Sequence, residues 1–266
     1  MREGRLDGSE GSVCYRVWAP EGPAERVVLL VHGYAEHGGR YAHVAERLVE
    51  EGAAVWAPDH VGHGLSDGER TLIRDFEHVV DDLHALAELA RREHGAVPLI
   101  VAGHSMGGLL TARFAQRAPD SVAGVAFLGA VLGNWRWARE ALAAPELPPA
   151  DTSFEGMSRD PATVREYRED PLVYHGRYKR PLLEAEVRAL DAFNAGIDRL
   201  AMPVLFLHGS DDPYVPVRDS LDAAVRMPSR DKWMRVYPGA RHELVHETNR
   251  AEVLDDLAAF ARRAGD

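Results

Sequence analysis

Five short apolar runs are spaced along the chain, each bounded by Gly, Pro or charged residues. They are rich in β-branched and aliphatic side chains, as strands buried on both faces of a sheet are. These predicted strands span residues 26–32, 54–59, 98–104, 122–128 and 203–209. A further strand is predicted at K-W-M-R-V-Y, shortly before the C-terminal segment.

The segments between these runs have a helical pattern. Val79, Val80, Leu83, Leu86 and Ala90 recur at helical spacing, and so do Val253, Leu254, Leu257 and Phe260. Strands that alternate with amphipathic helices are typical of a mainly parallel sheet with helices on both faces. The predicted fold class is therefore α/β.

Residues 132–200 interrupt this alternation. No strand is predicted there, whereas prolines and aromatic side chains are frequent, and the sheet pattern resumes at Pro203. A segment that leaves a sheet after one strand and returns at the next is typical of a cap over a site. We therefore predict a core formed by residues 1–131 and 201–266, with a helical cap inserted between them.

Charge and cysteine content narrow the classes of partner. The chain of 266 residues has a formal net charge of −11. This charge disfavours nucleic acid and anionic membranes as main partners, because both require clustered positive charge.

Cys14 is the only cysteine and lies in an alternating stretch that predicts a strand. An intrachain disulfide and a cysteine-based metal site are therefore excluded.

Neither a signal peptide nor a membrane span is predicted. The N-terminal residues are polar, and no segment approaches the roughly 18 uninterrupted apolar residues of a spanning helix. We expect a cytoplasmic protein. A transient contact of the cap with a membrane or micelle stays open, and so does the oligomeric state.

The strongest chemical signal is G-H-S-M-G at residues 103–107. It follows a predicted strand and precedes a helical pattern, which is the context of a nucleophile elbow. In such a turn the serine has a strained backbone, and the glycines leave room for the strand-to-helix crossing. Ser105 is therefore the candidate nucleophile, with the Met106 N–H at the helix start as an oxyanion donor.

A serine nucleophile needs a base and an orienting acid, which in this type of fold follow it in the order acid, then histidine. Asp211 and Asp212 follow the strand at 203–209, and His242 lies in P-G-A-R-H-E-L after the last predicted strand. Either aspartate fits the acid at this point. The His-Gly turn after the strand at 26–32 makes the Tyr34 N–H the second candidate oxyanion donor.

His242, Glu243 and His246 also match H-E-x-x-H, a zinc motif when it lies on a helix. Pro238-Gly239 immediately before the motif favours a turn, and the longer metalloprotease pattern is not continued. The serine interpretation is therefore preferred, and no metal is predicted. His246 is expected at a helix start or on the surface.

His60-x-x-His63 also suggests a metal site, but it lies in the glycine-rich stretch D-H-V-G-H-G-L-S. The glycines are typical of a tight loop, so a structural role is predicted for both histidines.

Six stretches resemble the monoacylglycerol lipase and lysophospholipase group of α/β-hydrolases. They are H-G-Y-A-E-H-G-G-R-Y (32–41), P-D-H-V-G-H-G-L-S (58–66), G-H-S-M-G-G (103–108), D-P-L-V (170–173), G-S-D-D-P-Y-V (209–215) and Y-P-G-A-R-H-E-L (237–244). The combination of H-G-x-x-E-H with G-H-S-M-G-G is more specific than either motif alone. The resemblance covers the chain from about residue 12 to its end.

This resemblance implies an α/β-hydrolase fold with a helical lid and a serine esterase site. It assigns Ser105 as nucleophile, His242 as base and, from the G-S-x-D pattern, Asp212 as acid, and it supports Tyr34 and Met106 as oxyanion donors. Glu36 and Arg40 either orient the polar end of a substrate or form an ion pair that braces the loop. The stretch R-W-A-R-E-A-L-A-A-P-E-L-P-P-A-D-T-S (136–153) carries more charge and proline than a strongly membrane-inserting lid.

We therefore predict hydrolysis of carboxylic esters with medium or long acyl chains, in particular monoacylglycerols, through an acyl-enzyme and without a cofactor. The alternatives are a short-chain carboxylesterase, a lysophospholipase, a cofactor-free haloperoxidase, a proline peptidase and a non-catalytic binding protein. Dehalogenases and epoxide hydrolases of this fold use an Asp nucleophile, which Ser105 disfavours.

Overall fold

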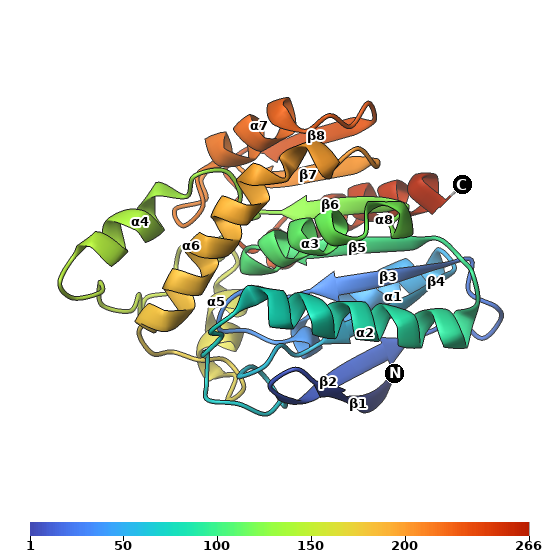
Figure 1. Ribbon diagram of the computed structural model, residues 1–266, viewed down its shortest axis with the longest axis horizontal. Coiled ribbons are helices and arrows are strands. Elements are labelled where there is room, and N and C mark those ends of the chain that lie inside the picture. Colours follow the sequence, from blue (N-terminus) through green and yellow to red (C-terminus); the bar gives the residue numbers. More distant parts are fainter. Residues whose placement is uncertain (266) are drawn as a thin grey trace.

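An eight-stranded sheet forms the centre of the computed structural model, which describes residues 1–265 (Figure 1). The strands are β1 (Arg2–Gly8), β2 (Gly11–Trp18), β3 (Arg26–Val31), β4 (Ala53–Pro58), β5 (Leu99–His104), β6 (Gly124–Leu128), β7 (Val204–Gly209) and β8 (Lys232–Tyr237). Their order is β1-β2-β4-β3-β5-β6-β7-β8. β3 to β8 are parallel, and the β1–β2 hairpin joins them through an antiparallel β2–β4 pair.

Helices cover both faces of this sheet. The α-helices are α1 (Ala42–Glu50), α2 (Phe76–His94), α3 (Met106–Arg117), α4 (Arg136–Ala143), α5 (Pro161–Glu169), α6 (Arg180–Ala195), α7 (Val217–Arg226) and α8 (Arg250–Gly265). Four short 3₁₀ helices are η1 (Gly38–Tyr41), η2 (Pro119–Ser121), η3 (Ile197–Arg199) and η4 (Leu244–His246). In Figure 1, α2 and α3 lie in front of the sheet, and α1 and α8 lie behind it.

The central strands are buried on both faces, which explains their continuous apolar sequence. In β3, Val27 and Leu29 pack into one core cluster with α2, α3 and α6. Val28 and Leu30 point the other way and pack with α1 and α8. The sheet therefore lies between two apolar cores, and because both are well packed they give the loops at its edges a rigid support.

The sheet confirms the predicted fold class, since β3 to β7 coincide with the five apolar runs to within two residues at each end. Cys14 lies in β2 and is buried, and burial raises the pKa of its thiol. β1 was not predicted. It is an edge strand in which Leu6 alone is buried, so its sequence lacks the apolar signal of the central strands.

The chain between β6 and β7 contains α4, α5, α6 and η3. Leu183, Ala189 and Phe193 of α6 belong to the same apolar core as α2 and α3, while α4 and its loops extend past the end of the strands (Figure 1). The division into a core and a cap at residues 132 and 200 stays a prediction. None of the helices within residues 1–265 has the length and apolar content required to cross a membrane.

Candidate active site

Ser105 occupies the sharp turn between β5 and α3. Its backbone has φ 54° and ψ −121°, a strained conformation for a residue other than glycine. Two hydrogen bonds fix the turn, from the Ser105 N–H to the Leu128 carbonyl and from the Val131 N–H to the Ser105 carbonyl. A Cβ on Gly103 would lie 2.2 Å from the Gly107 carbonyl oxygen, so the crossing requires glycine there.

The predicted base and one predicted acid line up with this serine. His242 Nε2 lies 3.0 Å from Ser105 Oγ, and His242 Nδ1 lies 2.7 Å from Asp212 Oδ2. His242 lies in the loop between β8 and η4, and Asp212 follows β7. The alternative acid, Asp211, is exposed and accepts a hydrogen bond from the Ser210 hydroxyl. Three distant segments of the chain thus meet at one edge of the sheet.

Asp212 is held as a carboxylate by four groups. Its Oδ1 accepts hydrogen bonds from the Tyr214 N–H at 2.9 Å and the Val215 N–H at 3.0 Å, and its Oδ2 faces His242. Burial alone would raise the pKa of Asp212, but the attraction of His242 and the hydrogen bonds from His208 and His242 hold it far below its ordinary value.

His208 is a second histidine beside this acid, and the sequence did not reveal it. It lies in β7, is fully buried, and places Nε2 3.4 Å from Asp212 Oδ2 and 2.9 Å from the Val215 carbonyl oxygen. Both oxygens only accept, so Nε2 carries a proton. Its Nδ1 lies 2.9 Å from the Ser220 hydroxyl oxygen. Asp212 Oδ2 therefore faces two imidazole rings, those of His242 and His208.

The electrostatic setting of His242 suits a proton acceptor. Burial opposes a charge on the imidazole, but the adjacent Asp212 carboxylate outweighs it, so the pKa of His242 is raised above its ordinary value. With Asp212 accepting from Nδ1–H, Nε2 of the neutral ring is free to accept the Ser105 proton.

Two backbone N–H groups next to Ser105 have no acceptor among residues 1–265: those of Tyr34 and Met106. Met106 starts α3, and Tyr34 lies in the loop after β3. A Cβ on Gly33 would lie 3.1 Å from Ser105 Cβ, so this loop lies directly against the nucleophile. Both predicted oxyanion donors are thus available at the turn.

Glu36 and Arg40 form a buried ion-pair cluster with Glu243. The Arg40 guanidinium donates to Glu36 Oε2 at 2.8 Å and to both Glu243 oxygens at 2.6 and 2.7 Å. Glu36 Oε1 accepts from the Gly33 N–H and the Tyr41 hydroxyl. Burial opposes the charge on Glu243, but Arg40 lowers its pKa to about 2. These contacts favour the bracing interpretation, although Glu36 and Glu243 also face the cavity described below.

His242, Glu243 and His246 do not have the helical geometry that the H-E-x-x-H zinc motif requires. Only η4 is helical in this stretch, so His242 and His246 do not share a helix face. His246 was expected at a helix start or on the surface. It lies instead at the end of η4, where its mostly buried ring places Nε2 3.1 Å from the Arg40 carbonyl oxygen. Burial lowers the pKa of His246 to about 3.

His60 and His63 pack with His32 under the loop that follows β4. The His60 N–H donates to His32 Nε2 at 2.9 Å, and the rings of His32 and His60 lie 4.0 Å apart. Burial lowers the pKa of His60 to about 3 and that of His63 to about 4, so both are neutral. These contacts hold the loop after β4 against the end of β3.

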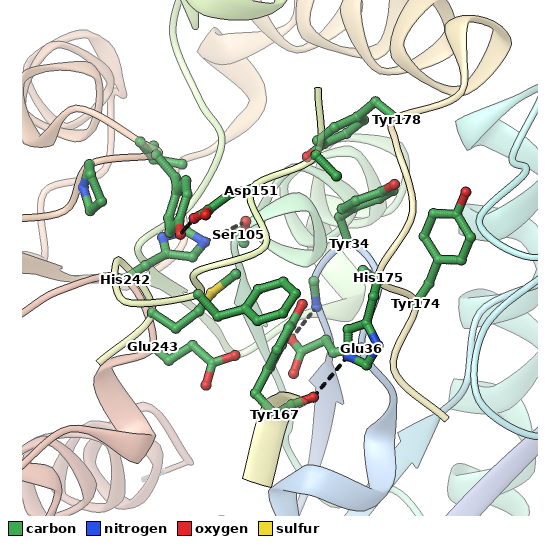
Figure 2. Close-up of a pocket in the computed structure, with 18 of the residues that line it drawn as sticks. Tyr34, Glu36, Ser105, Asp151, Tyr167, Tyr174, His175, Tyr178, His242 and Glu243 are labelled. Carbon is green, nitrogen blue, oxygen red and sulfur yellow. Dashed lines mark hydrogen bonds between the residues drawn. The ribbon is translucent and has the colours of Figure 1, made fainter. Parts of the chain in front are cut away.

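A cavity of about 280 Å³ opens above Ser105 and His242 (Figure 2). Residues of the 132–200 segment supply more than half of its lining, including Trp137, Phe154 and Tyr178. The loops after β3 and β7 supply most of the rest. The sequence showed the aromatic residues of this segment, but not which of them face the site.

The strained serine turn, the Ser–His–Asp line and the parallel sheet together define an α/β-hydrolase. Comparison with known families agrees, because a model described as serine aminopeptidase, S33, matches residues 22–249. The chain belongs to this family.

Individual relatives show which members of the family the chain resembles. The chain is 35% identical to the monoacylglycerol lipase of Mycolicibacterium smegmatis over 93% of this chain and 92% of that one. It is 31% identical to the monoglyceride lipase of Homo sapiens, over 87% and 80% of the two chains. The crystal structure of Paleococcus ferrophilus monoacylglycerol lipase superposes with a TM-score of 0.83 at 26% identity, covering 95% and 99%. The predicted family, the α/β-hydrolase fold and the assignment to the hydrolytic enzymes are confirmed.

Proposed function

We propose that the chain hydrolyses carboxylic esters of medium or long acyl chains, monoacylglycerols in particular, through an acyl-enzyme on Ser105. The observation that carries the proposal is the hydrogen-bonded line from Ser105 through His242 to Asp212 at the floor of a largely apolar cavity. The relatives named monoacylglycerol or monoglyceride lipase support glycerol esters as the substrate class.

In the acylation step, Ser105 Oγ attacks the ester carbonyl carbon while its proton passes to His242 Nε2. Asp212 keeps Nδ1 protonated and stabilises the imidazolium. The Tyr34 and Met106 N–H groups donate to the oxyanion of the tetrahedral intermediate. His242 then protonates the glycerol oxygen as the carbon–oxygen bond breaks, and the acyl group stays on Ser105.

In the deacylation step, His242 Nε2 takes a proton from water as the water oxygen attacks the acyl carbon. The same two N–H groups stabilise the second oxyanion. His242 returns the proton to Ser105 Oγ, and the free acid leaves. The residues of this chain supply every proton transfer in the cycle.

We further propose that residues 132–200 act as the cap of this site. Their side chains cover the cavity, so closure over a bound ester would exclude bulk water from the reaction. The cluster of Glu36, Arg40 and Glu243 braces the Tyr34 loop, and the cavity-facing carboxylates favour the hydroxyl-bearing end of the substrate on that side.

The test is a chain-length series of monoacylglycerols, from butanoyl to octadecanoyl glycerol, with free acid as the readout. Ser105→Ala should lose activity by about a thousandfold or more. Ser121→Ala is the matched control, because Ser121 ends η2 and does not face the cavity. A fluorophosphonate probe should label the wild type and the Ser121→Ala variant but not Ser105→Ala.

Full activity of Ser105→Ala would contradict the assignment of the nucleophile. Low activity on all monoacylglycerols with high activity on short-chain esters would identify a general carboxylesterase instead. The family description also names an aminopeptidase, so aminoacyl nitroanilides belong in the panel. Faster cleavage of these amides than of the esters would identify a peptidase.

A further inference from the structure

Aromatic side chains dominate the walls of the cavity. Eight Tyr, Trp and Phe residues face it, against three long or branched aliphatic residues, Leu147, Met157 and Val215. Five of the eight tyrosines of the chain are among them. A straight alkyl chain requires only apolar contact, so ester hydrolysis alone does not account for this excess of rings.

Four of these rings form a continuous row, which we call the aromatic wall: Trp135, Trp137, Tyr178 and Tyr34. Neighbouring ring centres lie 5.2 Å apart for Trp135 and Trp137, 5.3 Å for Trp137 and Tyr178, and 3.9 Å for Tyr178 and Tyr34. The Tyr34 and Tyr178 rings are parallel to within 10°. Figure 2 shows them stacked across the pocket from His242.

The position of the aromatic wall points to the acyl side of the substrate. Its Tyr34 end belongs to the loop that lies against Ser105, so a group bonded to Ser105 Oγ begins next to the wall. Glu36 and Glu243 also line the cavity, and their charged side chains suit the hydroxyl-bearing side of the substrate better than its acyl group. The lining of the cavity therefore combines an apolar aromatic wall with a charged cluster.

The geometry of the rings favours a particular kind of acyl group. Tyr34 stacks on Tyr178 and meets Tyr174 edge to face, with ring centres 6.5 Å apart. Aromatic pairs gain stability in both geometries beyond the area that they bury. An incoming aromatic ring can make either contact with rings of the wall, whereas an alkyl chain or a saturated ring can make neither. The volume of about 280 Å³ is at the small end of ligand cavities, which also favours a compact group.

On the basis of the proposed function, we propose that the aromatic wall binds the acyl group and that the protein prefers esters of compact arylalkanoic acids. The preference holds over straight-chain acids with the same number of carbon atoms. It also holds over saturated-ring acids of the same shape, because only an aromatic ring can stack on the wall or meet its rings edge to face.

Three glycerol monoesters test this proposal: 3-phenylpropanoyl, 3-cyclohexylpropanoyl and nonanoyl glycerol, whose acyl groups have equal carbon counts. Glycerol as the common alcohol avoids an aromatic leaving group that could itself occupy the wall. The wild type should have a kcat/KM about three- to tenfold higher for the phenyl than for the cyclohexyl ester, the effect of one or two ring contacts.

Substitutions in the wall should remove this ratio. We expect a phenyl-to-cyclohexyl ratio near one for Tyr178→Leu, an intermediate ratio for Trp137→Leu and an unchanged ratio for Tyr178→Phe. Trp233→Leu is the matched control, since Trp233 is exposed on β8 and does not face the cavity. The rate of fluorophosphonate labelling at Ser105 verifies that each variant is folded.

Equal kcat/KM for the phenyl and cyclohexyl esters in the wild type would overturn the proposal, and so would a ratio that survives Tyr178→Leu in a labelled variant. A faster reaction with nonanoyl glycerol than with the phenyl ester would overturn it as well. If the wild type cleaved none of the three esters above the Ser105→Ala background, the proposed ester hydrolysis itself would fail together with the acyl preference.

Discussion

The loops at the edge of the sheet and the segment between β6 and β7 border the same cavity, but they hold their side chains in different ways. Ser105 is fixed by a strained turn and by backbone hydrogen bonds, and Asp212 by two backbone N–H donors. Trp137 and Tyr178 are positioned by ring packing instead. Polar bonds require one geometry, whereas apolar packing tolerates several side chains of similar volume. The chemistry therefore depends on a few residues, and the shape of the cavity on many.

The sharpest test on the sheet side compares two adjacent aspartates. Asp212→Asn should lower kcat by about 10⁴-fold, as the equivalent change does in other Ser-His-Asp enzymes, because an amide cannot hold His242 in the tautomer with Nδ1 protonated. Asp211→Asn should leave kcat unchanged, since Asp211 is exposed and its side chain accepts a hydrogen bond from the Ser210 hydroxyl rather than from His242. Steady-state kinetics on one monoacylglycerol measure both. Comparable losses in the two variants would contradict the assignment of Asp212.

The next test removes the brace beneath the Tyr34 loop. Arg40→Met leaves the buried Glu36 and Glu243 carboxylates unpaired, and we expect the free energy of unfolding to fall by about 3–5 kcal/mol. Arg47→Met is the control, because its partners Glu51 and Asp255 are partly or largely exposed, and a loss of about 0–1 kcal/mol is expected. Urea unfolding measures the difference. Similar losses in both variants would show that the cluster is not a structural brace.

A smaller effect is expected behind the acid. His208→Leu removes the donor beside Asp212 Oδ2 and should lower kcat by about ten- to a hundredfold with little change in KM. His208→Gln can still place an N–H donor there and should keep most of the activity. A KM effect without a kcat effect, or equal losses in the two variants, would exclude a positioning role for His208.

The last prediction concerns α6, which belongs to the segment between β6 and β7. Glu186 is fully buried, has no hydrogen-bond partner among residues 1–265, and burial raises its pKa to about 8. A raised folded-state pKa means that stability is complete below the unfolded pKa near 4.3 and is lost as pH rises toward 8. Glu186→Gln should therefore flatten this decline, which amounts to at most about 1.4 kcal/mol per pH unit.

Urea unfolding at about pH 5 and pH 8 measures this slope. The exposed Glu184 on the same helix provides the control, and Glu184→Gln should keep the wild-type slope. An equal decline in the wild type and Glu186→Gln would mean that Glu186 does not titrate in this range.

The sequence predicted the features that depend on short local patterns. Apolar runs located the central strands, and G-H-S-M-G located Ser105 because the turn requires its glycines. Asp212 could be separated from Asp211 only by resemblance, since both follow β7 and only the fold shows which one turns toward His242. β1 lies at the edge of the sheet and buries only Leu6, so its polar sequence lacks the apolar pattern that located the central strands.

Features that depend on long-range packing could not be predicted. Arg40 and Glu243 are far apart in the sequence, and nothing local indicates that they pair. His208 is one histidine within an apolar strand, and its contact with Asp212 follows from the turn after β7. The aromatic residues between 132 and 200 were evident as a composition, but their order along the cavity wall depends on how α4 and α6 pack.

α6 also limits how the chain could be rearranged. β6 and β7 are parallel neighbours, so the chain must travel back along the sheet between them, and α6 packs in the core beside α3 on that return path. A graft or deletion that exchanged the whole 132–200 segment would therefore remove the connection that makes the parallel pair possible. The part of the segment that could be exchanged ends before α6 begins at Arg180. Within that limit, the residues that line the cavity could be replaced while the scaffold is kept.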